Sequence, residues 1–190
     1  MKVLSIDIDF LFDCQDYHKL TNFDLTAEQS WAMINALGNK YEPHKKYLEL
    51  LKSILKKNTD KNTKIEIITE HDEIIKTMEN NNITESDLFN FDFHHDVTYF
   101  EGDSKLTIEN WVRYAKSKNL VSRYNWIHRE LSEYDFKPPF NFDRICVCDL
   151  NLNVLPKFDL VVICISKHFT PMEYWESLPK ELYNIVKGVN

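Results

Sequence analysis

The chain has 190 residues, of which 43% are hydrophobic and 13% aromatic, so we expect one domain, residues 1–190, with a buried core. Its net charge of -7 argues against nucleic acid as a partner, because phosphate binding requires clustered Lys and Arg. No apolar run approaches the roughly 20 residues of a membrane helix and acidic residues come early, so we predict a cytoplasmic protein with no membrane partner.

Glycine and cysteine usage excludes several site types. The chain has three glycines, too few for a P-loop or a dinucleotide-binding fingerprint. Cys146, Cys148 and Cys164 lie in apolar, strand-like runs, where reduced core thiols are expected. The Cys146-x-Cys148 spacing also lacks the second pair of a zinc knuckle.

Apolar runs that predict strands alternate with amphipathic stretches that predict helices. The predicted strands are residues 2–9, 64–69, 88–93, 123–128, 144–149 and 159–166. The predicted helices are residues 27–37 capped by Thr26, 43–57 opened by Pro43, 72–80, a stretch capped by Thr107, and 171–187 opened by Pro171. This alternation predicts an α/β fold of three α/β/α layers with a mainly parallel sheet.

In such folds ligands bind beyond the carboxyl ends of the strands, and several of the predicted strands end in acidic or histidine residues. The most concentrated case is Asn90-Phe91-Asp92-Phe93-His94-His95-Asp96. In extended geometry Asp92, His94 and Asp96 share one face and His95 points away. Three such groups are costly together unless a cation neutralises them, so a metal site is favoured over a solvated polar turn.

A larger set of ligands gathers when the other strand ends are included. Asp7 and Asp9 end the first strand on one face, and His71 follows the second strand. With Asp92, His94 and Asp96 they supply four carboxylates and two imidazoles, a set that suits two divalent cations about 3.5–4 Å apart. Oxygen and nitrogen ligands without a thiolate favour manganese, which iron or cobalt could replace.

The motifs resemble those of a known family. Asp92-Phe93-His94-His95-Asp96 is similar to the Asp-x-His-x-Asp metal motif of the arginase (ureohydrolase) family, and Ser5-Ile6-Asp7-Ile8-Asp9 to its Ser-x-Asp-x-Asp motif. The resemblance implies an arginase-like fold with two Mn²⁺ ions. It further implies that Asp7 and Asp92 bridge the ions, that His71 and Asp96 complete one, and that Asp9 and His94 complete the other.

Two further stretches resemble an arginase-like branch that includes peptide arginases, which convert arginine side chains in a peptide to ornithine. They are Ile108-Glu109-Asn110-Trp111 and Ser166-Lys167-His168-Phe169-Thr170-Pro171. The substrate implied is an arginine-containing peptide or a small guanidino compound. Asp96 and His168 are then candidates for proton transfer, and Glu173 and Glu109 for carboxylates that bind the guanidinium.

The chain departs from the family in two ways. The Asp-x-Asp motif precedes Asp-x-His-x-Asp, which implies a circular permutation or a different strand order, and the chain is short. Three alternatives to a binuclear-manganese hydrolase stay open. They are a zinc amide hydrolase of the related deacetylase type, a haloacid dehalogenase-type phosphatase that uses Asp7 and Asp9, and a non-catalytic metal-binding module.

Overall fold

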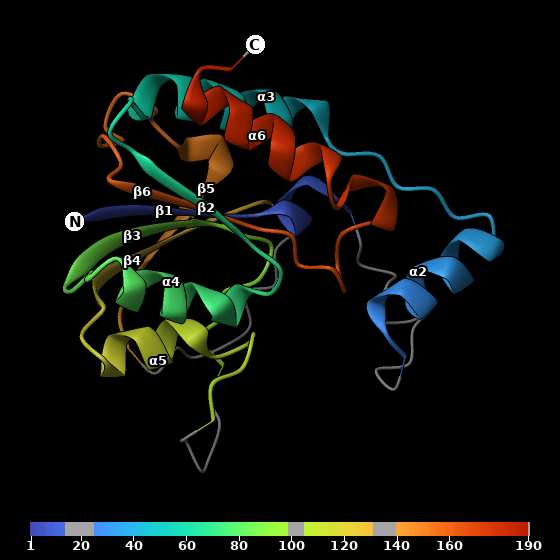
Figure 1. Ribbon diagram of the computed structural model, residues 1–190, viewed down its shortest axis with the longest axis horizontal. Coiled ribbons are helices and arrows are strands. Elements are labelled where there is room, and N and C mark those ends of the chain that lie inside the picture. The colour runs from blue at the N-terminus through green and yellow to red at the C-terminus, as the bar shows by residue number, and fades with distance from the viewer. Residues whose placement is uncertain (14–24, 99–104, 131–139, 190) are drawn as a thin grey trace.

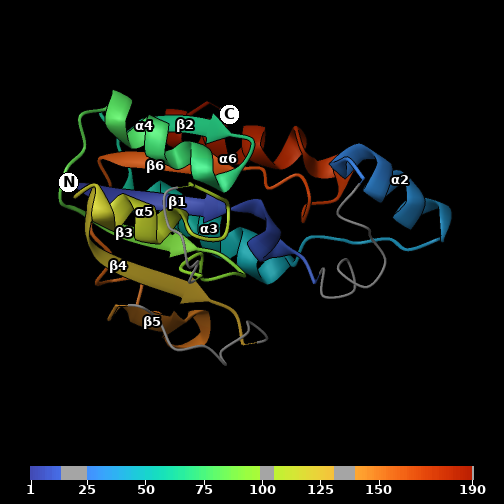
Figure 2. The ribbon, with the colours of Figure 1, turned by 90° about the horizontal axis from the view of Figure 1, so that it is seen from below.

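The computed structural model describes residues 1–13, 25–98, 105–130 and 140–189. Their centre is a six-stranded sheet in the order β2-β6-β1-β3-β4-β5, and each neighbouring pair runs parallel (Figures 1 and 2). The strands are β1 (Lys2–Asp7), β2 (Lys64–Ile68), β3 (Ser86–Phe91), β4 (Val121–His128), β5 (Asp143–Cys146) and β6 (Leu160–Cys164). The predicted α/β class with a parallel sheet is therefore confirmed.

Helices cover both faces of this sheet. The α-helices are α2 (Ala27–Ala36), α3 (Lys45–Asn58), α4 (Ile74–Asn80), α5 (Trp111–Ser117) and α6 (Ser177–Lys187). Short 3-10 helices lie at Ile8–Leu11, His71–Glu73, Val147–Asp149 and Met172–Tyr174. Helices α3 and α6 lie over one face, α4 and α5 over the other, and α2 lies beyond the carboxyl edge of the strands (Figure 1).

Alternation along the central strands builds the two cores. In β1, Leu4 and Ile6 belong to the core under α3 and α6, whereas Val3 belongs to the core under α4 and α5. Ser5 and Asp7 share the face of Val3, because successive side chains of a strand point to opposite sides. That face therefore changes from apolar to polar towards the carboxyl end of β1, where the candidate site lies.

The start of α2 follows the predicted local chemistry. The Thr26 side chain accepts a hydrogen bond from the Gln29 backbone N–H (3.3 Å), and the Gln29 side chain accepts one from the Thr26 backbone N–H (2.9 Å). This reciprocal pair satisfies two amides at the first turn of the helix. Gly38 follows the helix with φ +82°, a left-handed conformation in which glycine has no side chain to strain.

Several predicted boundaries are wrong. The first strand ends at Asp7 and the third at Phe91, two residues earlier than predicted in each case. Thr107 does not cap α5, whose N-terminal cap residue is Asn110. After Pro171 the chain forms a separate 3-10 helix, and α6 begins only at Ser177.

The cysteine prediction is also wrong in part. Cys146 and Cys148 are joined by a disulfide at the end of β5, and Cys148 is exposed, so neither is a reduced core thiol. Cys164 is free and buried, as predicted. Among the residues that the structure describes, no helix has the length and apolar character needed to cross a membrane.

Candidate metal centre

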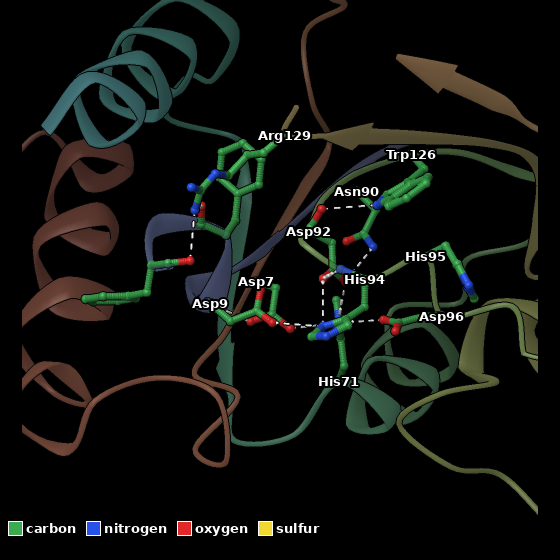
Figure 3. Close-up of polar contacts among 12 residues, drawn as sticks. Asp7, Asp9, His71, Asn90, Asp92, His94, His95, Asp96, Trp126 and Arg129 are labelled. Atoms are coloured by element: carbon green, nitrogen blue, oxygen red, sulfur yellow. Dashed lines mark hydrogen bonds and ion pairs between the residues drawn. The ribbon is translucent and has the colours of Figure 1, made fainter. Parts of the chain in front are cut away.

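The six predicted ligands come from three strand ends. Asp7 is the last residue of β1 and Asp9 lies in the following 3-10 helix, His71 opens the 3-10 helix after β2, and Asp92 directly follows β3. His94 and Asp96 come from the next turn of the chain. In Figure 3 the imidazole of His71 lies at the centre, with carboxylates on both sides of it.

Asp7 and Asp92 each bend the chain through a hydrogen bond between the side chain and the backbone, and each points its other carboxylate oxygen into the site. The Oδ1 atom of Asp7 accepts a hydrogen bond from the backbone N–H of Asp9 (3.0 Å), and Oδ1 of Asp92 accepts one from the backbone N–H of His94 (2.8 Å). Such side-chain hydrogen bonds to the residue two positions on compete with the strand ladder and end it. The Oδ2 atom of each aspartate then faces His71.

His71 brings three carboxylates together. Its Nδ1 atom lies 3.1 Å from Asp7 Oδ2, 3.2 Å from Asp92 Oδ2 and 3.0 Å from Asp96 Oδ2. Its Nε2 atom lies 2.8 Å from the Ser5 hydroxyl oxygen on the same face of β1. When the ring proton is on Nε2 and donated to Ser5, Nδ1 directs a lone pair towards three negatively charged oxygens.

A second group forms around His94. Its Nδ1 atom lies 3.0 Å from Asp9 Oδ2 and 4.0 Å from Asp92 Oδ1. Donor atoms of Asp9, Asp92 and His94 thus lie close enough to hold one ion, and so do those of His71, Asp92 and Asp96. Asp92 belongs to both groups, one oxygen facing each imidazole. The two groups are therefore adjacent and share a carboxylate.

Buried hydrogen-bond donors hold Asp92 and Asp96 in position. The Asn90 side-chain amide donates to Asp92 Oδ2 (3.0 Å), and the Trp111 indole N–H donates to Asp96 Oδ2 (2.5 Å). The Trp126 indole N–H donates to the backbone oxygen of Asp92 (3.1 Å) (Figure 3). Both tryptophans are buried core residues, but each also supports the site, which core packing alone does not indicate.

The electrostatics of the site reflect several ionisable groups buried close together. Burial raises the pKa of Asp7 well above its usual value, and the carboxylates of Asp9 and Asp92 raise it further. Burial disfavours the charged form of His71, but Asp7, Asp92 and Asp96 outweigh it and hold its pKa well above 6.5. Burial likewise opposes the charge on His94, whereas Asp9 raises its pKa to about 10.

The donor set fits divalent cations. His71 Nδ1 and Asp9 Oδ1 are buried and have no hydrogen-bond partner among the described residues, although buried polar atoms are normally satisfied. Four carboxylates and two neutral imidazoles carry a charge of about −4, which two divalent cations would neutralise. A cation beside Nδ1 of the neutral His71 ring would accept its lone pair and bind the three surrounding carboxylates as further ligands.

Two side chains near the site were not predicted. The thiol of buried Cys164, opposite Asp7 in the β1–β6 pairing, lies within ligand distance of Asp7 and His71. Burial, Asp7 and Glu70 raise its pKa well above the usual value. Glu70, half-buried at the end of β2, has its pKa raised to about 7 by burial and by Asp72 and Glu73. The one sequence signal that could have indicated Glu70 is its position directly before His71.

The remaining predicted site residues lie on the surrounding loops. His168 is half-buried in the segment after β6, next to Phe169, whose ring lies 5.0 Å from that of His94. Glu173 is exposed in the 3-10 helix Met172–Tyr174, and Glu109 is exposed ahead of α5. Their roles stay predictions. His95 faces away from the carboxylates, as predicted, and its ring packs on Trp126 (Figure 3).

Comparisons of the chain with models of known protein families, with curated proteins and with solved structures find no match. The parallel sheet and the buried His and Asp groups at its carboxyl edge are compatible with a metal site.

Proposed function

We propose that this chain is a hydrolase that uses two divalent metal ions, manganese in the first place, to cleave the guanidinium group of arginine in a peptide. The products are urea and an ornithine side chain. One observation carries the proposal: His71 and His94 each gather carboxylates into a buried metal-sized group, and both groups use Asp92. A carboxylate shared between adjacent groups suits a pair of ions bound close together.

The substrate assignment rests on the sequence motifs. The Ser-x-Asp-x-Asp and Asp-x-His-x-Asp motifs resemble arginase-like enzymes, and their residues meet at one edge of the sheet. The Ile108–Trp111 motif also contributes to this edge, because Trp111 donates to Asp96. The likeness to peptide arginases in this motif favours arginine within a peptide over free arginine.

The reaction balances as the addition of one water to a protonated guanidinium, with cleavage of its bond to the side-chain nitrogen. Two bound divalent ions would supply Lewis acidity and lower the pKa of a water between them. Asp96 would orient that water and receive its proton at Oδ1, because Oδ2 is engaged by Trp111. The leaving amine also takes up a proton, for which His168 is the proposed donor.

A guanidinium needs carboxylate partners in its plane. Glu173 and Glu109 are the partners that the motifs suggest, and both are exposed. Glu70 joins them as a third candidate, because its half-buried carboxylate follows β2 at the rim of the cluster. The family resemblance contains no role for Glu70.

A zinc amide hydrolase is the second candidate, and Cys164 favours it. A thiolate beside Asp7 and His71 would add a soft ligand, which zinc accepts better than manganese does. Against zinc, burial and the charge of Asp7 hold the Cys164 sulfur in its protonated form, and its S–H points to the backbone oxygen of Thr69 at 3.8 Å. The phosphatase alternative requires a nucleophilic Asp7, but Asp7 is buried and both of its carboxylate oxygens are engaged.

The test uses blocked peptides that contain one arginine or one acetyl-lysine. Manganese-loaded protein should release urea from the arginine peptide and lower its mass by one CH₂N₂ unit. Asp92→Ala should abolish this turnover, and Glu79→Ala, which removes an exposed carboxylate of α4, should retain it. Deacetylation of the lysine peptide by zinc-loaded protein would favour the second candidate, and no turnover of either peptide would contradict both.

A further inference from the structure

A second cluster of metal-competent groups lies at the edge of the sheet. Cys146 ends the edge strand β5, and its disulfide partner Cys148 lies in the following 3-10 helix. Cys146 is half-buried and Cys148 is exposed. Cysteine is among the most buried residue types in proteins, so two cysteines outside the core in the pattern Cys-x-Cys call for a chemical explanation.

Stabilisation of the fold does not explain this disulfide. A cross-link stabilises mainly by restricting the unfolded chain, and the effect grows with the length of the loop that it closes. Cys146 and Cys148 are two residues apart, so the bond closes almost the shortest possible loop. The two strands that hold this edge together, β4 and β5, are already paired through the backbone.

A third donor converges on the two sulfurs. Glu130 follows β4, the neighbour of β5, and its carboxylate lies with both sulfur atoms in one group whose members are within 4.8 Å of one another. The backbone N–H of Cys148 donates to the sulfur of Cys146 (3.4 Å), and a donor at this position favours a thiolate over a thiol. Reduction of the disulfide would therefore leave two sulfur ligands and one carboxylate facing each other.

We propose that Cys146, Cys148 and Glu130 form a redox-gated binding site for a thiophilic divalent cation such as Zn²⁺. In the reduced protein two thiolates and one carboxylate hold the ion, and the fourth position is left to water. This site differs in kind from the cluster around His71, whose donors are mainly carboxylate oxygens and imidazole nitrogens.

Oxidation would release the ion. The oxidant is a small-molecule disulfide: the two thiolates of Cys146 and Cys148 give up two electrons and form one S–S bond, and the S–S bond of the reagent takes them and breaks into two thiolates. The ion then loses both sulfur ligands, and one carboxylate is too little to hold it. Loss of the ion thus reports the redox state of its surroundings at an accessible edge of the domain.

The experiment compares zinc binding by reduced and oxidised full-length protein, measured by competition with a chromophoric chelator after removal of the reductant. The reduced protein should bind one equivalent more than the oxidised protein. The extra equivalent should disappear in the Cys146→Ser, Cys148→Ser variant and bind at least tenfold more weakly in Glu130→Gln. Cys14→Ser, which removes a cysteine outside the described residues, should retain it.

Cadmium provides a readout that does not depend on a variant. Cd²⁺ should give a sulfur-to-metal charge-transfer band in the reduced protein, and oxidised glutathione should abolish the band and release the ion. Equal zinc binding in both redox states, or an extra equivalent that survives the double serine substitution, would overturn the proposal. Because Asp92→Ala leaves the three ligands intact, the extra equivalent should persist in that variant even if the proposed hydrolase activity is never found.

Discussion

Replacement of Trp111 by Phe tests how the buried shell supports the candidate metal centre. The Trp111 side chain is completely buried, and its indole N–H donates to Asp96 Oδ2 at 2.5 Å. Phe keeps the aromatic packing on His71 but removes this donor. Loss of a hydrogen bond to a charged acceptor should lower the free energy of unfolding by about 1.5–3 kcal/mol. The smaller ring leaves a cavity of roughly 40 Å³, which should lower it by about 1 kcal/mol more.

Metal affinity should respond through Asp96. A carboxylate that loses its supporting donor is less well oriented, and loss of such partners weakens metal binding by about 10–100-fold. Trp126→Phe is the matched control, because Trp126 is equally buried but donates to the backbone oxygen of Asp92 rather than to a carboxylate. Trp126→Phe should lower the free energy of unfolding by a similar amount for the cavity and by about 0.5–1.5 kcal/mol for the lost neutral hydrogen bond. It should weaken metal binding by less than about tenfold.

Competition titration of Mn²⁺ with a chromophoric chelator measures the affinities, and urea denaturation of the metal-free variants measures stability. If Trp111→Phe binds Mn²⁺ as tightly as the wild type, or if Trp126→Phe is the weaker binder, the assignment of Asp96 as a ligand held by Trp111 is refuted.

Three further predictions concern the site and the segment next to it. Ser5→Ala removes the hydroxyl 2.8 Å from His71 Nε2 and should weaken Mn²⁺ binding by about tenfold in the same titration, with Ser53→Ala on exposed α3 surface as an unaffected control. Removal of metal by a chelator should lower the free energy of unfolding by about 2.7 kcal/mol for each bound ion, relative to protein in metal at 100 times its dissociation constant; a thermal midpoint unchanged by the chelator would contradict this. Asp13→Asn should destabilise the protein more at pH 7 than at pH 3. Partial burial works against the charge of Asp13, but His44 and Arg129 outweigh it and lower its pKa, so its stabilising contribution is present above 3.8 and lost as the pH falls through the lower folded value. Denaturation curves at the two pH values measure the difference, and an equal deficit at both would rule out the charge as its cause.

The sequence was sufficient for the parallel α/β sheet because alternating strand and helix patterns extend over much of the chain. It also located His71 and Asp92 at strand ends, where a parallel sheet collects its polar residues. It did not predict the bend after Phe91. Extended alternation was expected through Asp96, but the Asp92 side chain captures the His94 amide, and Asp96 takes a left-handed conformation with φ +53°. Local hydrogen bonding outcompetes the strand there.

Contacts between residues far apart in the sequence could not be predicted either. No local pattern indicates that Ser5 meets His71, 66 positions away, or that Asn90 supports Asp92 rather than the sheet alone. The same holds for Cys164 and for the meeting of Glu130 with Cys146, because these contacts depend on the strand order β2-β6-β1-β3-β4-β5. Spacing within one strand end is readable from sequence, whereas the neighbours of that strand are set by the packing of the whole sheet.

The most direct test of the metal centre is metal analysis of protein purified without chelators, together with the variants Asp92→Ala and Glu79→Ala. Because Asp92 contributes to both groups of donors, two equivalents of divalent metal, mainly manganese, should be present in the disulfide-bonded wild type and in Glu79→Ala, and both should be lost together in folded Asp92→Ala. A single equivalent in the wild type, or loss of only one of two equivalents in Asp92→Ala, would contradict a binuclear centre built around Asp92.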